Sequence, residues 1–240
     1  MTIRNRNIYV VLAAICIAAV SIGTGSAAQF DFITVGDVVK NVQNKFGSLK
    51  TYQAKFTITS EKLDKKRIQQ GTVSYKNSNK LLIHFTSPQG QKIVCNDKTM
   101  WIYIPSMNVV AEQDLKSDSG ILSATTSTGL KRLFSKYHYR FDGKEQPETQ
   151  SDGSKFYTLF LKQKESRSGY RSLKLWISED YMIQRASGET ASGKKVDITF
   201  SGIKTGMDLS NGMFKFDIPS QARVIKNPMI AEAEEIQKEE

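Results

Sequence analysis

Between about residues 51 and 203, apolar and polar residues alternate with a period of two, and short polar turns interrupt the alternation. The stretch 52–59 shows this most clearly, because every even position is apolar and every odd position is polar. A period of two indicates strands that bury one face and expose the other. Frequent turns are typical of strands that follow one another in an antiparallel meander. The chain is therefore expected to be mainly β.

The alternation predicts about eleven strands in one sheet. Their expected positions are residues 51–59, 68–76, 81–85, 91–95, 100–104, 107–113, 137–142, 154–163, 171–178, 181–189 and 195–203. A further short strand is expected at residues 214–218. Because strands twist, a sheet of this size must close on itself, or half-close around something that fills it.

Residues 32–48 follow a helical period instead. The apolar positions that share one helix face are Val35, Val38, Val39, Val42 and Phe46. This spacing predicts an amphipathic helix. Thr34 and Asp31 are both candidates for its N-cap, and Gly47 is a candidate for its end. Such a helix is a natural filling for a curved sheet.

A second segment, residues 118–136, also departs from the strand pattern. It mixes Ser, Thr and Gly with a few large apolar side chains, and residues 131–136 are expected to form a short helix. The segment is too polar for a core element and too apolar for an ordinary loop. We therefore expect it to act as a movable lid. The lid residues expected from the sequence are Ile121, Leu122, Leu130, Leu133 and Phe134.

Residues 1–28 are typical of a signal peptide. Arg4 and Arg6 precede an apolar run at residues 8–22, and small residues follow it up to Ala28. The run is shorter than the roughly 20 apolar residues that span a bilayer, so cleavage before about Gln29 is expected. Export to the periplasm follows, or secretion from a host with one membrane.

Two further boundaries follow from composition. Residues 29–225 are expected to form a single domain, because no linker or internal repeat divides them. Residues 226–240 are acidic and poor in apolar side chains, so a disordered tail is expected there.

The chain is basic, with 34 Lys and Arg against 24 Asp and Glu, a formal net charge of +10. Such a surface favours anionic partners, for example lipid headgroups, glycans or acidic protein patches. Alternatively, the charge serves only to keep the protein soluble. Nucleic acid is not expected as a partner after export.

Residues with catalytic or metal-binding potential are few. The two histidines, His84 and His138, have no second His or Cys at the spacing of a zinc site. No nucleophile elbow and no phosphate-binding loop is found. Glu179 and Asp180 are adjacent but fit a hairpin turn better than an acid–base pair. Although scattered carboxylates could still converge in space, we expect no enzyme, no metal and no cofactor.

Large apolar side chains gather instead on one face of several predicted strands. They are Tyr52, Phe56, Leu81, Ile83, Phe85, Trp101 and Tyr103. These residues either fill a core or line a cavity. A sheet of this size encloses more volume than one helix can fill, and barrels with spare volume usually hold a ligand. The sequence thus favours an apolar binding cavity.

Several motifs occur in an order that resembles the LolA-type outer-membrane lipoprotein carriers. The first is aromatic-x-Ala-x-Phe at residues 52–56, followed by Gln-x-Gly ending at Gly71. A proline turn at Pro88 precedes Lys-Thr-Met-Trp-Ile-Tyr-Ile-Pro at residues 98–105. Near the end, Phe-x-Phe-x-Ile-Pro at residues 214–219 precedes Val224.

The resemblance implies an open antiparallel half-barrel of about eleven strands, covered by the N-terminal helix and the helical lid. It also implies a periplasmic carrier that holds the acyl chains of lipoproteins in an apolar cavity and ferries them to the outer membrane. The partners would be acylated lipoproteins, an inner-membrane lipoprotein exporter and an outer-membrane acceptor. A monomer is expected.

One departure from the family concerns the lid. Other carriers have an Arg-Pro pair before the third strand, and that arginine holds the lid down when the cavity is empty. Asn77 and Ser78 stand there in this chain, so the sequence leaves open how the lid is held. Two other uses of the fold also remain open: a lipid- or lipoprotein-sensing regulatory module, and a secreted basic protein that binds surfaces.

Overall fold

The computed structural model describes residues 32–77, 79–96, 98–115, 127–165 and 169–227. The expected signal peptide, the lid residues Ile121 and Leu122, and the tail from residue 228 lie outside the described residues. The elements, in chain order, are α2 (Val35–Ser48), β1 (Thr51–Lys62), β2 (Lys65–Lys76), β3 (Lys80–Ser87), β4 (Lys92–Cys95), β5 (Thr99–Ile104), the 3-10 helix η1 (Pro105–Met107), β6 (Val109–Asp114), α3 (Ser127–Ser135), β7 (Tyr137–Phe141), β8 (Glu148–Thr149), β9 (Lys155–Gln163), β10 (Tyr170–Ser178), β11 (Ile183–Thr190), β12 (Lys195–Thr205), the 3-10 helix η3 (Asn211–Phe214) and β13 (Arg223–Lys226).

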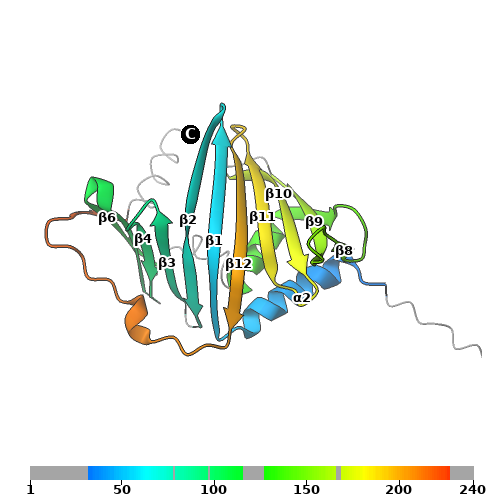
Figure 1. The fold of residues 1–240 in the computed structure, drawn as a ribbon, viewed down its shortest axis with the longest axis horizontal. Helices are drawn as coiled ribbons and strands as arrows, with labels where there is room; N and C mark the ends of the chain where they lie inside the picture. Colours follow the sequence, from blue (N-terminus) through cyan, green and yellow to red (C-terminus); the bar gives the residue numbers. More distant parts are fainter. Residues whose placement is uncertain (1–31, 78, 97, 116–126, 166–168, 228–240) are drawn as a thin grey trace, which may run out of the picture. The chain divides into compact units, whose positions relative to one another are not determined.

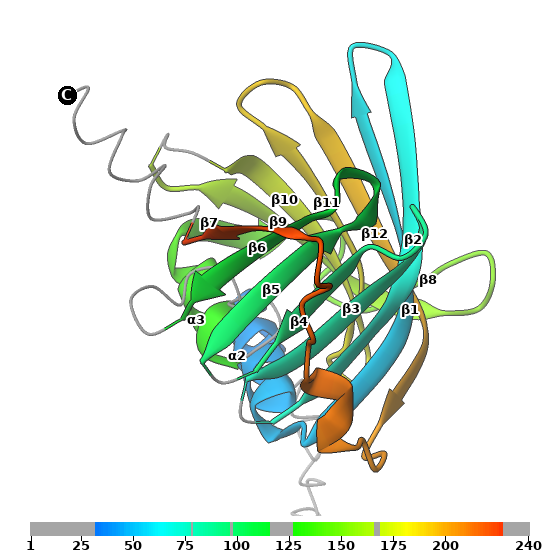
Figure 2. The same ribbon diagram turned by 90° about the vertical axis from the view of Figure 1, so that its left-hand side faces the viewer.

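The strands form one sheet in the order β13-β6-β5-β4-β3-β2-β1-β12-β11-β10-β9-β7, with β8 paired to β9 beside this path. Neighbouring strands are antiparallel throughout, except that β13 runs parallel to β6. The two ends of the sheet, β13 and β7, do not pair with each other in the described structure. The prediction of an open, curved, mainly antiparallel sheet covered by helices is confirmed (Figures 1 and 2).

Both helices lie on the concave face of this sheet (Figure 2). The apolar face of α2 buries four residues, Val38, Val39, Val42 and Phe46, as its spacing predicted. Thr34 is the N-cap: its side chain accepts a hydrogen bond from the Asp37 backbone N–H, and the Asp37 carboxylate accepts one from the Thr34 backbone N–H. This reciprocal arrangement satisfies two N–H groups that no helical partner can reach.

Hydrogen bonds from Thr34 also act on the charge of Asp37. The Thr34 hydroxyl donates to the Asp37 carboxylate over 2.6 Å, and the Thr34 backbone N–H donates over 3.0 Å. These bonds lower the pKa of Asp37 below its usual value because they favour the ionised carboxylate. A negative charge in the first turn also suits the helix dipole.

The segment after β12, residues 206–227, crosses the outer face of the sheet, and we call it the strap. Figure 2 shows it passing over β3, β4 and β5 before it reaches β6. The Lys76 ammonium donates to the Leu209 carbonyl over 2.7 Å, and the Arg223 N–H donates to the Asn108 carbonyl over 2.9 Å. The strap thereby covers outer-face apolar residues and pairs with the free edge of β6.

The strap contradicts one prediction. Residues 214–218 are not a strand: Phe214 ends η3, and the residues after it pair with no strand in the described structure. The chain crosses the strands here instead of running alongside one, so its apolar residues pack onto the sheet face. The last strand, β13, comes later and includes Lys226, which the sequence placed in the tail.

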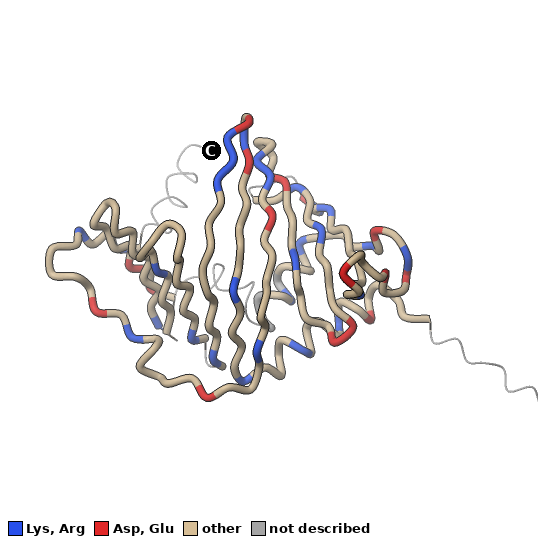
Figure 3. Tube along the Cα trace, in the orientation of Figure 1, with Lys and Arg blue, Asp and Glu red and all other residues tan. Residues whose placement is uncertain are grey.

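The hairpin of β1 and β2 extends beyond the neighbouring strands (Figures 1 and 2). Leu63 and Asp64 form its turn with φ of 48° and 59°, and the Leu63 side chain is 85% exposed. Lys and Arg residues flank the turn on both strands (Figure 3). The apolar interior therefore gives way to a charged, fully solvated tip.

Candidate ligand-binding cavity

An apolar cavity of about 260 Å³ lies on the concave face, between the two helices and the middle of the sheet. Its lining residues are Phe46, Leu49, Tyr52, Val73, Tyr75, Leu130, Leu133, Leu175, Ile183, Ala186, Ile198 and Phe200. None of these side chains is charged. The cavity is therefore suited to an apolar ligand, because such a ligand would displace only weakly held water.

Each wall follows from the pattern of its element. The last turn of α2 and the residue after it supply Phe46 and Leu49, and α3 supplies Leu130 and Leu133. Strands β10, β11 and β12 place Leu175, Ala186 and Ile198 side by side in register. The small Ala186 side chain in the middle of this row leaves space that a larger residue would fill.

Two tyrosines provide the polar atoms of the lining. Tyr52 on β1 and Tyr75 on β2 are direct partners in the antiparallel register. Each side chain is 7% exposed. Burial raises the pKa of both phenols above its usual value, because the phenolate loses hydration. Both hydroxyls stay protonated at any physiological pH.

Of the seven residues predicted to line an acyl cavity, Tyr52 lines this apolar cavity and the other six do not. Phe56, Leu81 and Phe85 are buried in the core on the same face, and Ile83 packs against that core. The rings of Phe56 and Phe85 meet edge to face with centroids 5.3 Å apart. These four residues pack in the core beside the cavity and do not form part of its wall.

The structure contradicts the prediction for Trp101 and Tyr103, which lie on the outer face. Their neighbours Met100 and Ile102 face the core instead. Both rings pack against Phe216 of the strap, at centroid distances of 6.1 and 6.0 Å, and the Trp101 indole N–H donates to Glu112 over 3.0 Å. The continuous apolar run of β5 was the available signal, because such runs indicate strands that are covered on both faces.

The predicted lid is described in part. Its helix, α3, begins at Ser127, earlier than the sequence indicated. Leu130 and Leu133 line the cavity, whereas Phe134 is 3% exposed and packs edge to face on Tyr139 at 6.0 Å. Phe134 therefore anchors the helix to the sheet.

The position that holds the lid arginine in other carriers lies in the turn after β2. The Asn77 backbone N–H donates to the Lys50 carbonyl over 2.8 Å, which fixes this turn to the loop between α2 and β1. The residue is an asparagine, so an arginine does not hold α3 from this position.

Most residues of the cavity wall were not predicted from the sequence. The strands β2 and β10 to β12 supply Val73, Tyr75, Leu175, Ile183, Ala186, Ile198 and Phe200. Period-two alternation placed these residues on predicted strands but could not show which of them meet beneath the helices. That depends on strand order, which brings β1 next to β12 across more than 100 residues of chain.

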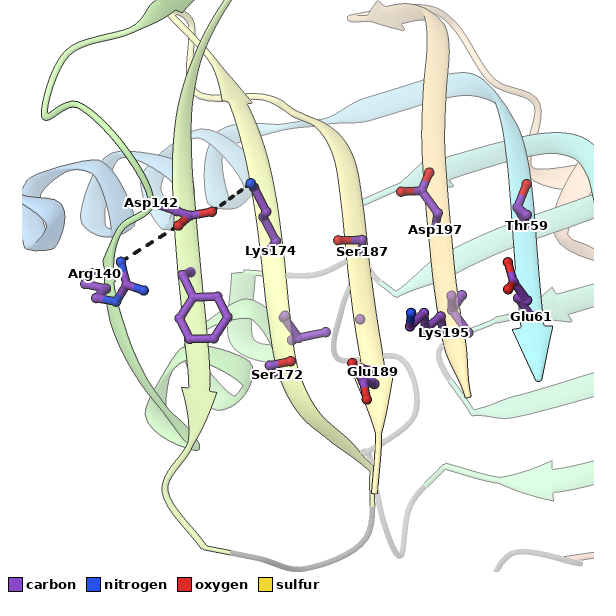
Figure 4. Close-up of a pocket in the computed structure, with 14 residues that line it drawn as sticks. Thr59, Glu61, Arg140, Asp142, Ser172, Lys174, Ser187, Glu189, Lys195 and Asp197 are labelled. Carbon is purple, nitrogen blue, oxygen red and sulfur yellow. Dashed lines mark ion pairs between the residues drawn. The ribbon is translucent and has the colours of Figure 1, made fainter. Parts of the chain in front are cut away.

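A second hollow, of about 510 Å³, lies on the outer face and is lined mostly by polar and charged residues (Figure 4). Its centre is a cross-strand row: Arg140, Phe160, Lys174, Ser187, Asp197 and Thr59. Lys174 and Arg140 pair with Asp142 at 2.7 and 3.8 Å, as Figure 4 shows, and Arg185 pairs with Asp197 at 2.8 Å. Because these charged side chains pair with one another and remain partly exposed to solvent, the groove does not suit an apolar ligand.

Two further features bear on function. In the described ranges, no three or more His, Cys, Asp or Glu side chains are placed to hold a metal ion together. No helix in the described part of the chain has both the length and the apolar character needed to cross a membrane.

The chain matches the family model for "Outer membrane lipoprotein carrier protein LolA" over residues 47–217. A curated outer-membrane lipoprotein carrier protein of Hahella chejuensis is 24% identical over 217 residues, which are 90% of this chain and 97% of that one. An uncharacterized protein of Methanocaldococcus jannaschii is 23% identical over 192 residues. These cover 80% of this chain, but they span only 53% of the archaeal protein.

Among solved structures, an uncharacterized conserved protein from Thermus thermophilus has a similar fold, with a TM-score of 0.53 and 16% identity. The superposition covers 80% of this chain and 98% of that one. At this identity the likeness concerns the fold alone.

Proposed function

The chain belongs to the LolA family of outer membrane lipoprotein carrier proteins, and we therefore propose that it carries lipoproteins. In this proposal, the cavity beneath α2 and α3 holds the acyl chains of the cargo. The observation that supports it is the lining of that cavity, twelve apolar or aromatic residues without a charge. The protein acts by binding and release, without catalysing a reaction.

The physical need for such a cavity is large. Each methylene group removed from water is worth roughly 0.8 kcal/mol. Several long acyl chains would therefore cost tens of kcal/mol in water. A lipoprotein can cross an aqueous compartment only if its chains are covered throughout the passage. We place this passage in the periplasm, between an inner-membrane exporter and an outer-membrane acceptor, with the carrier as a monomer.

The size of the cavity implies movement. Its volume of about 260 Å³ is small beside the roughly 300–1,000 Å³ of pockets that enclose drug-sized ligands. Two or three acyl chains do not fit into this space. Loading therefore requires α2 and α3 to separate from the sheet, and Leu130 and Leu133 would then move with α3.

A release assay tests the proposal. Spheroplasts that retain newly made lipoproteins in the inner membrane are incubated with purified mature chain, and the soluble fraction is probed for lipoprotein. We expect release in a one-to-one soluble complex. A regulatory module or a surface-binding protein would leave the lipoproteins on the membrane, and that result would refute the carrier function.

Bovine serum albumin at the same concentration is the matched control, because it binds acyl chains without membrane partners. Release by the chain but not by albumin would identify a specific transfer from the exporter. Equal release by both proteins would show only that the chain scavenges lipids.

A further inference from the structure

The cavity holds a pair of phenol groups whose hydrogen bonds are not made within the described structure. Tyr52 and Tyr75 stand directly opposite each other on β1 and β2, and both line the cavity. Neither hydroxyl has a hydrogen-bond partner among the described residues. By contrast, the buried Tyr137 donates its hydroxyl to the Tyr170 carbonyl over 2.9 Å.

The two hydroxyls reach open space. Every buried side-chain nitrogen or oxygen that is fully sealed from solvent has a hydrogen-bond partner in the described structure. Since Tyr52 and Tyr75 lack one, their hydroxyl oxygens are not sealed. Both side chains are more than nine-tenths buried and both line the cavity, so the cavity is the enclosed space beside them.

A hydroxyl without a hydrogen-bond partner in an apolar cavity is unfavourable unless a ligand supplies the missing hydrogen bond. Both phenols keep their proton, because burial raises their pKa. Both hydroxyls can therefore donate a hydrogen bond, and neither has an acceptor among the described residues. No cation lines the cavity, so an acceptor with a full negative charge, such as a free carboxylate, would be poorly stabilised there.

We propose that Tyr52 and Tyr75 form a polar subsite that donates hydrogen bonds to the neutral carbonyl oxygen of an ester-linked acyl chain. The inference rests on the proposed function and deepens it, because it names the acyl ester as the group that is recognised. The hydrocarbon of the acyl chain packs against the apolar wall, and the hydrogen bonds to its ester carbonyl fix how deeply the chain enters the cavity. The cavity then distinguishes an acylated ligand from a plain alkyl chain.

Two synthetic lipopeptides test this subsite. One carries two palmitoyl esters on a glyceryl-cysteinyl peptide, and the other carries two hexadecyl ethers on the same peptide. A neutral hydrogen bond changes a binding constant by about 2- to 10-fold. We expect the full mature chain to bind the ester probe about tenfold more tightly, and Tyr52→Phe/Tyr75→Phe to bind both probes with the affinity of the ether.

Several outcomes would overturn the subsite. Equal affinity of the unmodified chain for ester and ether would refute it while leaving the carrier function intact, and so would a preference that survives in the double variant. If the unmodified chain binds neither probe, the proposed function fails and the subsite fails with it.

The choice of substitution guards against loss of folding in the variants. Tyr→Phe at these positions removes hydroxyls without described partners, so the melting temperature should not fall. Tyr137→Phe is the matched control: it removes the bond to Tyr170, should lower the melting temperature, and should leave the ester preference unchanged.

Discussion

Gly71 stands where three residues of the sheet leave no room for a side chain. A Cβ atom there would clash with the His84 carbonyl oxygen and would lie 2.7 Å from the Phe56 ring and 2.9 Å from the Phe85 Cα. Gly71 pairs with Phe56 on one side and Phe85 on the other, and the register shifts beside it. The glycine of the Gln-x-Gly motif thus lets two strands and an aromatic ring approach closely.

We predict that Gly71→Ala lowers the free energy of unfolding by about 1–3 kcal/mol or more, because overpacking usually costs this much. Gly36→Ala is the matched control, because a Cβ there meets only the Thr34 hydroxyl at 3.5 Å. That change should stabilise α2 by up to about 1 kcal/mol. Urea denaturation of both variants measures the two effects, and a neutral Gly71→Ala would contradict the packing described.

The cap of α2 makes a second prediction at a single residue. Thr34→Ala should lower the free energy of unfolding at pH 7 by about 1 kcal/mol, because it removes an N-cap side chain. The Thr34 bonds lower the pKa of Asp37, so their stabilisation is present above the unfolded-state pKa and is lost as the pH falls through the lower, folded-state pKa. The difference between wild type and variant should therefore narrow below about pH 4. Urea titrations from pH 7 to 2 measure it, and a difference that stays constant would exclude the coupling.

At the scale of elements, α3 is the wall of the cavity that we propose to move. Leu133 is half-buried and faces the cavity, so Leu133→Ser removes apolar contact with a bound chain. A loss of about two methylene groups corresponds to roughly tenfold weaker binding of an acylated peptide. Lys131→Ser, an exposed position on the same helix, should bind normally. Isothermal titration compares the two, and equal affinities would remove α3 from the site.

Most helices and strands could be predicted from their periodicity, whereas the segments that pack against them could not. The apolar stripe of α2 and the alternation of residues 52–59 each depend on local sequence, and both were confirmed. The face that Trp101 and Tyr103 occupy depends on a strap about 110 residues later in the chain. No local pattern in β5 says which side that strap will cover. The family motifs gave the fold, but the cavity wall depends on strand order.

For the whole molecule, the strap holds the half of the sheet that carries β3 to β6. Phe214 is 2% exposed, and its helix, η3, contacts β3. Phe214→Ala should lower the free energy of unfolding by about 3–5 kcal/mol. In a Trp176→Phe background, it should also shift the fluorescence of Trp101 to longer wavelength as the strap detaches. Lys215→Ala, which is exposed, should do neither. An unchanged spectrum in Phe214→Ala would show that the strap does not cover Trp101 in solution.

The central claim is that acyl chains bind on the concave face of the sheet, and adjacent residues of β11 allow a direct test. Ala186 lines the cavity beneath the helices, whereas Ser187 lines the polar groove on the opposite face. The decisive measurement is the dissociation constant of an acylated peptide for Ala186→Phe and Ser187→Phe, with circular dichroism to confirm that both fold. If acyl chains bind in the cavity, Ala186→Phe should weaken binding by tenfold or more, on the order of the apolar burial it blocks, and Ser187→Phe should bind normally. Unchanged binding by Ala186→Phe, or a loss confined to Ser187→Phe, would place the ligand elsewhere and contradict the account.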